Sequence, residues 1–121
     1  MKFTQDNSAA AHAITAHAPG EVRIGERVLR SSVIVSADAL DEAWPVRSVV
    51  ELEGSLETVF SLQPEILILG TGETQHFPEP AVFAAVAARG IGFEVMDNGA
   101  ACRTYNVLLA EGRRVALALI L

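Results

Sequence analysis

The chain of 121 residues is poor in cysteine, and its histidines are scattered. One cysteine, Cys102, cannot form an internal disulfide or supply a cysteine-rich zinc site. The three histidines, His12, His17 and His76, lack a metal-ligand spacing with other ligand types. We therefore expect neither a structural metal nor a bound cofactor, and a reducing compartment, which we take to be the cytoplasm.

Positive charge is scarce as well. Fifteen Asp and Glu oppose nine Lys and Arg, which gives a net charge of −6, and no basic run is longer than Arg113-Arg114. Nucleic acids are bound through clusters of Lys and Arg along their phosphate backbones. Nucleic acid is therefore not an expected partner.

Long hydrophobic runs are missing too. The apolar run over residues 115–121 is far shorter than the roughly 20 residues that cross a bilayer. The first eleven residues carry Lys2 but also Asp6, with neither an apolar signal-peptide core nor several arginines. They predict neither a secretory signal nor a mitochondrial presequence, so we expect a soluble protein without membrane insertion.

Half of the residues are apolar, which suffices for one core in a chain of this length. We expect a flexible tail over residues 1–11 and a single domain over 12–121. Apolar residues alternate over 12–18 and again through Val22, Ile24 and Val28. Gly25-Glu26 suits a two-residue hairpin loop, and residues 33–35 add a short apolar strand. The first third therefore predicts a small antiparallel β layer.

The period changes after residue 38, where strands and helices begin to alternate. Buried strands are predicted over 65–70 and 93–96, a further strand over 48–52, and a final strand over 115–121. Helix signals follow Gly54-Ser55, Pro80 and Ala100. This alternation predicts an α/β fold with helices on both faces of a sheet, preceded by the antiparallel layer.

Polar and glycine residues follow two of the predicted strands. The first group is Gly70, Thr71 and Gly72, and the second is Asp97 and Asn98. Ligands of α/β sheets usually bind in a crevice at the carboxyl ends of strands, so adjacency of the two strands would join both loops in one ligand or partner site. The alternative is that the glycines permit tight turns and that Asp97 or Asn98 caps a helix.

The last predicted helix brings Cys102, Arg103 and Asn106 to this site. At about 100° per residue, Arg103 points away from the core, where it can bind an anionic ligand or a partner's carboxylate, and Cys102 lies on a half-covered flank. A helix N-terminus lowers a thiol pKa by less than one unit, so a nucleophile needs a base, and we consider His76 for that role. Asn106 on the same flank can instead tie the helix to the Gly70 loop. A free cysteine is by default a small buried hydrophobe.

Several short motifs together resemble a known family. They are Gly70-Thr71-Gly72, Phe77-Pro78, Gly90-Ile91, residues 94–97 and 101–108, and Glu111-Gly112-Arg113. The chain is similar to the small domain of mitochondrial respiratory complex I assembly factor 3 and its uncharacterised bacterial relatives. The resemblance covers residues 14–120. His76 is outside the pattern, and many relatives carry Thr where this chain has Asn98.

The resemblance implies a three-layer α/β fold around a mixed central sheet. For the mitochondrial member it implies a role in assembling an NADH dehydrogenase, and it brings no enzymatic activity. We therefore expect a non-catalytic interaction module whose partners are complex I subunits or assembly proteins. The alternative is a small-anion-binding protein or a cysteine-dependent enzyme using Cys102, with Thr71, Arg103 and Asn106 orienting the substrate.

Overall fold

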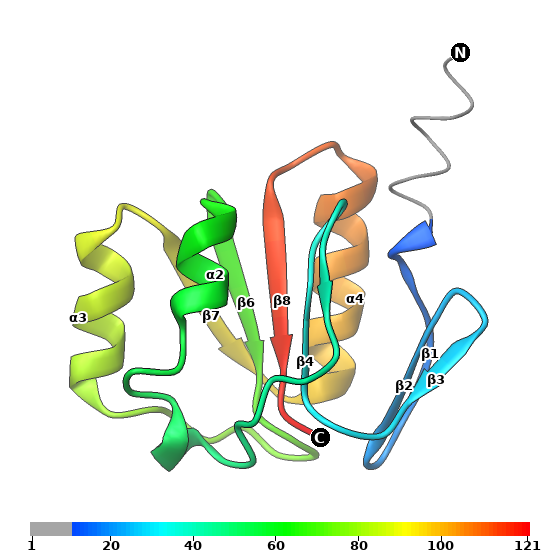
Figure 1. Cartoon of the computed structure of the whole chain (residues 1–121), viewed down its shortest axis with the longest axis horizontal. Helices are drawn as coiled ribbons and strands as arrows, with labels where there is room; N and C mark the ends of the chain where they lie inside the picture. Colours follow the sequence, from blue (N-terminus) through cyan, green and yellow to red (C-terminus); the bar gives the residue numbers. More distant parts are fainter. Residues whose placement is uncertain (1–10) are drawn as a thin grey trace.

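The computed structural model describes residues 11–121, which form two β-sheets and three α-helices (Figure 1), with one hydrophobic cluster on each face of the larger sheet. All but Ala11 of the predicted tail over residues 1–11 lies outside the described residues. A small antiparallel sheet comes first, with strands β1 (Ile14–Ala18), β2 (Glu21–Ile24) and β3 (Arg27–Leu29). The larger sheet has the order β5-β4-β8-β6-β7. Its strands are β4 (Val33–Val35), β5 (Leu40–Asp41), β6 (Ile66–Gly70), β7 (Gly92–Met96) and β8 (Val115–Leu119).

The predicted hairpin is confirmed. Ile24 pairs with Arg27, so Gly25 and Glu26 form a two-residue loop, and Gly25 adopts a φ of +61° that only glycine takes without strain. Val22 and Ile24 are buried while Arg23 between them is exposed, as expected of a sheet that packs one face on the core.

The larger sheet is mixed. Strands β6, β7 and β8 are parallel, whereas β4 runs antiparallel to β8. Helices α2 (Glu57–Leu62) and α3 (Pro80–Ala88) pack on one face against Leu67, Leu69 and the alanines of β8. Helix α4 (Asn98–Ala110) packs on the other face against Ile68 and Leu117, and the small sheet covers its far side (Figure 1). The predicted three-layer α/β fold, with helices on both faces, is therefore confirmed.

Two assignments of the sequence analysis are wrong. Residues 33–35 belong to the larger sheet rather than to the N-terminal layer, because this strand pairs with β8 and its three side chains are buried. Residues 48–52 form no strand but a 3₁₀ turn, η1 (Val49–Glu51), with backbone bonds from Glu51 N to Ser48 O and from Leu52 N to Val49 O. Val50 is 78% exposed. The β-branched residues Val49 and Val50 give this segment β propensity, but no strand among the described residues pairs with it.

Candidate functional site

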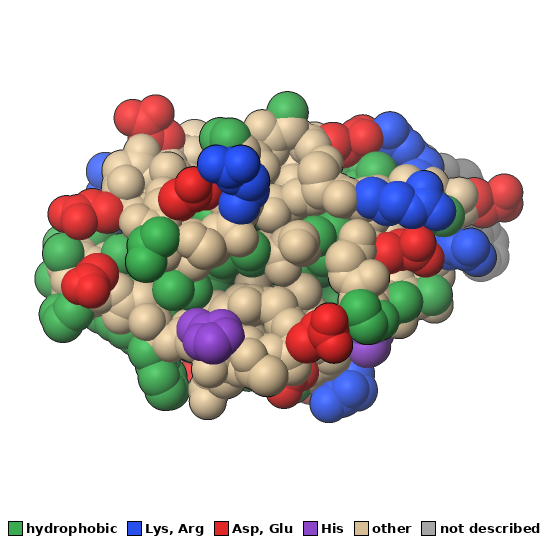
Figure 2. All heavy atoms as spheres, turned by 90° about the horizontal axis from the view of Figure 1, so that it is seen from below, with side chains coloured by type: hydrophobic (Ala, Val, Ile, Leu, Met, Phe, Trp, Pro, Cys, Tyr) green, Lys and Arg blue, Asp and Glu red, His purple; other side chains and the backbone are tan. Residues whose placement is uncertain are grey.

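The two predicted loops meet, because β6 and β7 are parallel neighbours. Thr71 N donates to Met96 O over 3.0 Å, and Asn98 N donates to Gly72 O over 2.8 Å. The predicted adjacency of the two strand ends is thus confirmed. Figure 2 looks onto this end of the molecule, where uncharged atoms occupy the centre and acidic and basic side chains lie around it.

Asn98 fills the space between the two loops. Its side-chain oxygen accepts from Gly72 N at 3.0 Å, and its amide nitrogen donates to Ile120 O at 2.9 Å. A Cβ on Gly70 would lie only 2.5 Å from Asn98 Oδ1 and from Leu119 Cδ1. Gly70 is therefore required for close packing, and Asn98 joins three chain segments at this junction.

The remaining polar groups of the junction are also engaged. The buried Thr71 hydroxyl donates to Thr74 O at 2.8 Å and accepts from His76 N at 2.9 Å. The His76 ring nitrogen Nε2 lies 2.8 Å from Thr74 Oγ1 on the exposed side of the same loop. Asp97 caps α4, since its carboxylate accepts from Ala100 N at 2.9 Å. These bonds give each group a structural role that needs no ligand.

Cys102 is completely buried, and the expectation of a half-covered side chain is wrong. Its side chain is 1% exposed because the small sheet covers the flank of α4 that a helical wheel leaves open. Burial raises the pKa of the thiol to about 11, against a smaller opposing effect of the Arg103 charge. Almost none of the Cys102 thiol is ionised at neutral pH. This disfavours Cys102 as a nucleophile and therefore also a catalytic pair of Cys102 and His76.

Asn106 has a different partner from the one expected. Its side chain accepts from Ile14 N at 2.9 Å and donates to Ile14 O at 2.8 Å, so it pairs with β1 and not with the Gly70 loop. The hydroxyl of the preceding residue, Tyr105, donates to His12 O at 3.0 Å, and burial raises the pKa of this hydroxyl. Both side chains fasten the N-terminal sheet to α4.

Arg103 is exposed, as predicted, and forms no ion pair with any residue in the range 11–121. A residue that the sequence analysis passed over lies beside it. A Cβ on Gly99 would lie 3.2 Å from His17 Cε1 and 3.4 Å from Arg103 Nη1. Asp97 Oδ1 also lies 3.4 Å from that position, so His17, Arg103 and the capping Asp97 carboxylate flank the first turn of α4. We name this exposed surface the Arg103 face. His17 lies here only because β1 packs against α4, so the spacing of residues in the sequence could not predict that His17 and Arg103 are neighbours.

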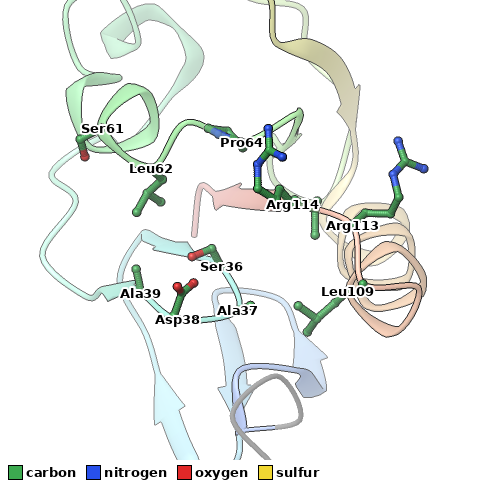
Figure 3. A pocket seen from close by; sticks show the side chains of 12 residues that line it. Ser36, Ala37, Asp38, Ala39, Ser61, Leu62, Pro64, Leu109, Arg113 and Arg114 are labelled. Atoms are coloured by element: carbon green, nitrogen blue, oxygen red, sulfur yellow. The ribbon is translucent and has the colours of Figure 1, made fainter. Parts of the chain in front are cut away.

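A hollow of about 780 Å³ lies at the opposite end of the sheet (Figure 3). Its walls are the β4–β5 turn, the end of α2 and the α4–β8 connection, and Asp38 and Leu62 point toward it from facing sides. Arg113 is turned away and pairs with Glu65, with Nε 3.2 Å from Oε1. Arg114 and Asp38 form no ion pair within the described part of the chain. No sequence motif marks these residues.

Two further properties concern metals and membranes. Among the described residues, no group of three or more His, Cys, Asp or Glu side chains is arranged to hold a metal ion. Within residues 11–121, every helix is too short or too polar to cross a bilayer.

Comparison with known proteins yields relatives with different names. NADH dehydrogenase [ubiquinone] 1 alpha subcomplex assembly factor 3 of Bos taurus is 36% identical over 104 residues, which are 84% of this chain and 55% of that protein. The chain therefore spans about half the length of this relative. A 13 kDa major membrane protein of Francisella tularensis is 29% identical over 90 residues, which are 74% of this chain and 69% of that protein.

Solved structures agree with the fold. An NMR structure of a Xanthomonas campestris protein is 48% identical and superposes with a TM-score of 0.83, covering 89% of this chain and 83% of that one. A family model described as protein of unknown function (DUF498/DUF598) matches residues 14–120. The resemblance seen in the sequence is thus confirmed: the chain is similar to NADH dehydrogenase [ubiquinone] 1 alpha subcomplex assembly factor 3, and it belongs to the DUF498/DUF598 family.

Proposed function

We propose that the chain is a non-catalytic interaction module that assists assembly of a respiratory NADH dehydrogenase. The observation that carries this proposal is the similarity of 84% of the chain to a protein named as an assembly factor for that enzyme. The geometry supports it, because the residues that suggested catalysis are buried or bonded within the fold. Cys102 is buried, and the Thr71 hydroxyl is engaged in hydrogen bonds to its own loop.

The Arg103 face is the contact surface that we propose for this role. The guanidinium of Arg103 forms no ion pair within residues 11–121, and the His17 ring lies beside it. The first turn of α4 adds the positive end of a helix dipole. A partner's Asp or Glu side chain can therefore be bound in bidentate fashion by Arg103.

Affinity capture from the native lysate tests this function. We expect a tagged full-length chain to recover NADH dehydrogenase subunits or assembly proteins, and Arg103→Glu to reduce that recovery about fivefold or more, since like charges then face each other. Arg23→Glu is the matched control, because Arg23 is exposed and has no ion pair among the described residues. Recovery of no respiratory subunit by the unmodified chain contradicts the proposal.

The cytoplasm is the location that we propose for this function. One cysteine, fully buried in the fold, suits a reducing compartment. Cell fractionation tests the location, since the proposal requires the chain in the soluble fraction and not in washed membranes. The test is informative because a relative from Francisella tularensis carries the name of a membrane protein.

A small-molecule binder is the second candidate, and the size of the hollow favours it. About 780 Å³ lies within the range of roughly 300–1,000 Å³ that ligand clefts occupy. Arg114 and Asp38 supply one charge of each sign beside apolar Leu62 and Leu109, which suits a zwitterion with an apolar body. Titration with free leucine, followed by NMR, should shift the amides of Ala37 and Arg114. Unchanged amide signals at millimolar leucine reject this candidate.

A further inference from the structure

Helix α3 has an unusual composition for a helix at the surface. It contains no charged side chain and none that forms hydrogen bonds, from Pro80 through Ala88. A helix that is apolar all round is normally buried on all sides. The fold buries only Val82 and Val86 completely and Phe83 in part. The outer side of α3 remains exposed over Pro80, Ala81, Ala84, Ala85, Ala87 and Ala88.

A groove runs between α3 and α2. Its apolar lining consists of Leu52, Leu56, Phe60, Ala81, Val82 and Ala85. The groove encloses about 200 Å³, less than the roughly 300–1,000 Å³ of a small-molecule cleft. It therefore suits an apolar side chain of a partner better than a free ligand. The Arg89 guanidinium lies 4.2 Å from the centre of the Phe60 ring and bounds the lining beside α2.

Acidic side chains border this groove. Glu53 and Glu57 are exposed in its lining, and Glu79 is exposed directly before α3. Arg89 is the one basic side chain in the lining. Figure 2 shows hydrophobic side chains on the α3 side of the molecule with acidic side chains among them. The surface is thus apolar with a negative border, which attracts a partner that carries positive charge.

The negative charge of the border also favours one kind of binding partner over the others. A second copy docked through the same surface by a two-fold axis brings its own Glu53 and Glu57 toward those of the first, which is repulsive. An anionic membrane is repelled for the same reason. An amphipathic helix with basic residues beside its apolar stripe satisfies both the lining and the border.

We propose that the groove between α2 and α3 docks an amphipathic helix of a partner protein. An apolar side chain of that helix enters between Phe60 and Ala85, and its basic side chains face Glu53 and Glu57. This surface lies across the central sheet from α4 and the Arg103 face. The inference therefore adds a second contact to the proposed function and does not depend on the first.

An NMR titration of the full, isotope-labelled chain tests the groove. The probe is a synthetic helical peptide of about 15 residues with Leu at positions i, i+3, i+4 and i+7 and Lys elsewhere. We expect saturable amide shifts centred on Leu52, Phe60 and Ala85. We expect no binding by a second peptide in which Glu replaces every Lys. Shifts centred elsewhere, or equal binding of the acidic peptide, overturn the proposal.

Two variants of α3 provide a matched pair. Ala85→Arg fills the groove and adds a positive charge, so it should weaken peptide binding about tenfold or more. Ala87→Arg makes the same change at an exposed position of the same helix outside the lining, and should alter binding less than about twofold. Both variants are first checked for an unchanged spectrum away from α3. Equal weakening by the two variants shows that only overall charge is sensed, which overturns the proposal.

The acidic border has its own test. The double variant Glu53→Gln and Glu57→Gln keeps side-chain shape and should reduce both the affinity and its dependence on salt. Light scattering of the free chain, at the protein concentration used in the peptide titration, should show a monomer. A dimer whose Ala85→Arg variant is monomeric assigns the groove to a second copy and overturns the proposal. Failure of these peptide experiments leaves the recovery experiment with Arg103→Glu unaffected.

Discussion

The two ends of the central sheet differ in how their loops are filled. At the carboxyl ends of β6 and β7, Asn98 and Thr71 close the space with side-chain hydrogen bonds to neighbouring loops. At the opposite end, the β4–β5 turn and the α4–β8 connection leave a hollow of about 780 Å³. The end whose residues suggested a binding site in the sequence is thus closely packed, whereas the end that no sequence motif marks is open. Glycine and polar residues after strands indicate tight backbone approach as readily as ligand binding.

Gly70→Ala should produce the largest effect at the packed end. The added Cβ meets Asn98 Oδ1 and Leu119 Cδ1 at 2.5 Å, so the junction must move apart, at about 3 kcal/mol of unfolding free energy. Urea unfolding measures the change. Gly99→Ala is the control, because its nearest neighbours are side-chain ends 3.2 to 3.4 Å away and alanine favours a helix. Equal destabilisation by the two variants contradicts the packed junction.

Asn106→Ala should lower stability by about 2 kcal/mol, because it leaves Ile14 N and Ile14 O without partners in a partly buried position. Thermal unfolding measures the loss, and hydrogen exchange at the Ile14 amide should accelerate. Val107→Ala, at a neighbouring position that is 57% exposed, should stay within about 0.5 kcal/mol of the parent. An unchanged melting temperature with altered partner binding would move Asn106 from the scaffold to a binding site.

Cys102→Ser should cost about 1 kcal/mol, since it places a hydroxyl among apolar side chains. The native thiol should also react slowly with iodoacetamide at pH 8, because burial raises its pKa to about 11. The same protein in urea serves as the reference, with an ordinary rate. A native rate that matches the unfolded one contradicts the buried thiol and reopens the cysteine hypothesis.

The smallest effect concerns Glu65 at the open end. Its hydrogen bond from Arg113 lowers its pKa below the value of 4.5, so the ionised form is stabilised in the folded state. The contribution to stability is present above pH 4.5 and is lost as the pH falls through the lower folded pKa. Glu65→Gln should therefore melt slightly below the parent at pH 7, and the difference should vanish near pH 2. A difference that grows at acid pH contradicts this sign.

The local patterns of the sequence determined most elements of the fold. Apolar periodicity, Gly25, Pro80 and Asp97 mark where strands and helices begin and end, because turn and cap chemistry acts within a few residues. The alternation of strands and helices is enough to predict the α/β class. The exposed position of Arg103 also follows from helical spacing alone.

Only the tertiary structure decided what the candidate residues touch. Cys102 is buried and Asn106 pairs with Ile14 because the small sheet packs over α4, a contact between segments 92 residues apart in the case of Asn106. The same contact brings His17 beside Arg103. The open hollow and the groove between α2 and α3 likewise arise where separate elements meet. Helical spacing tells which way a side chain points, whereas burial and hydrogen-bond partners depend on which distant segment packs there.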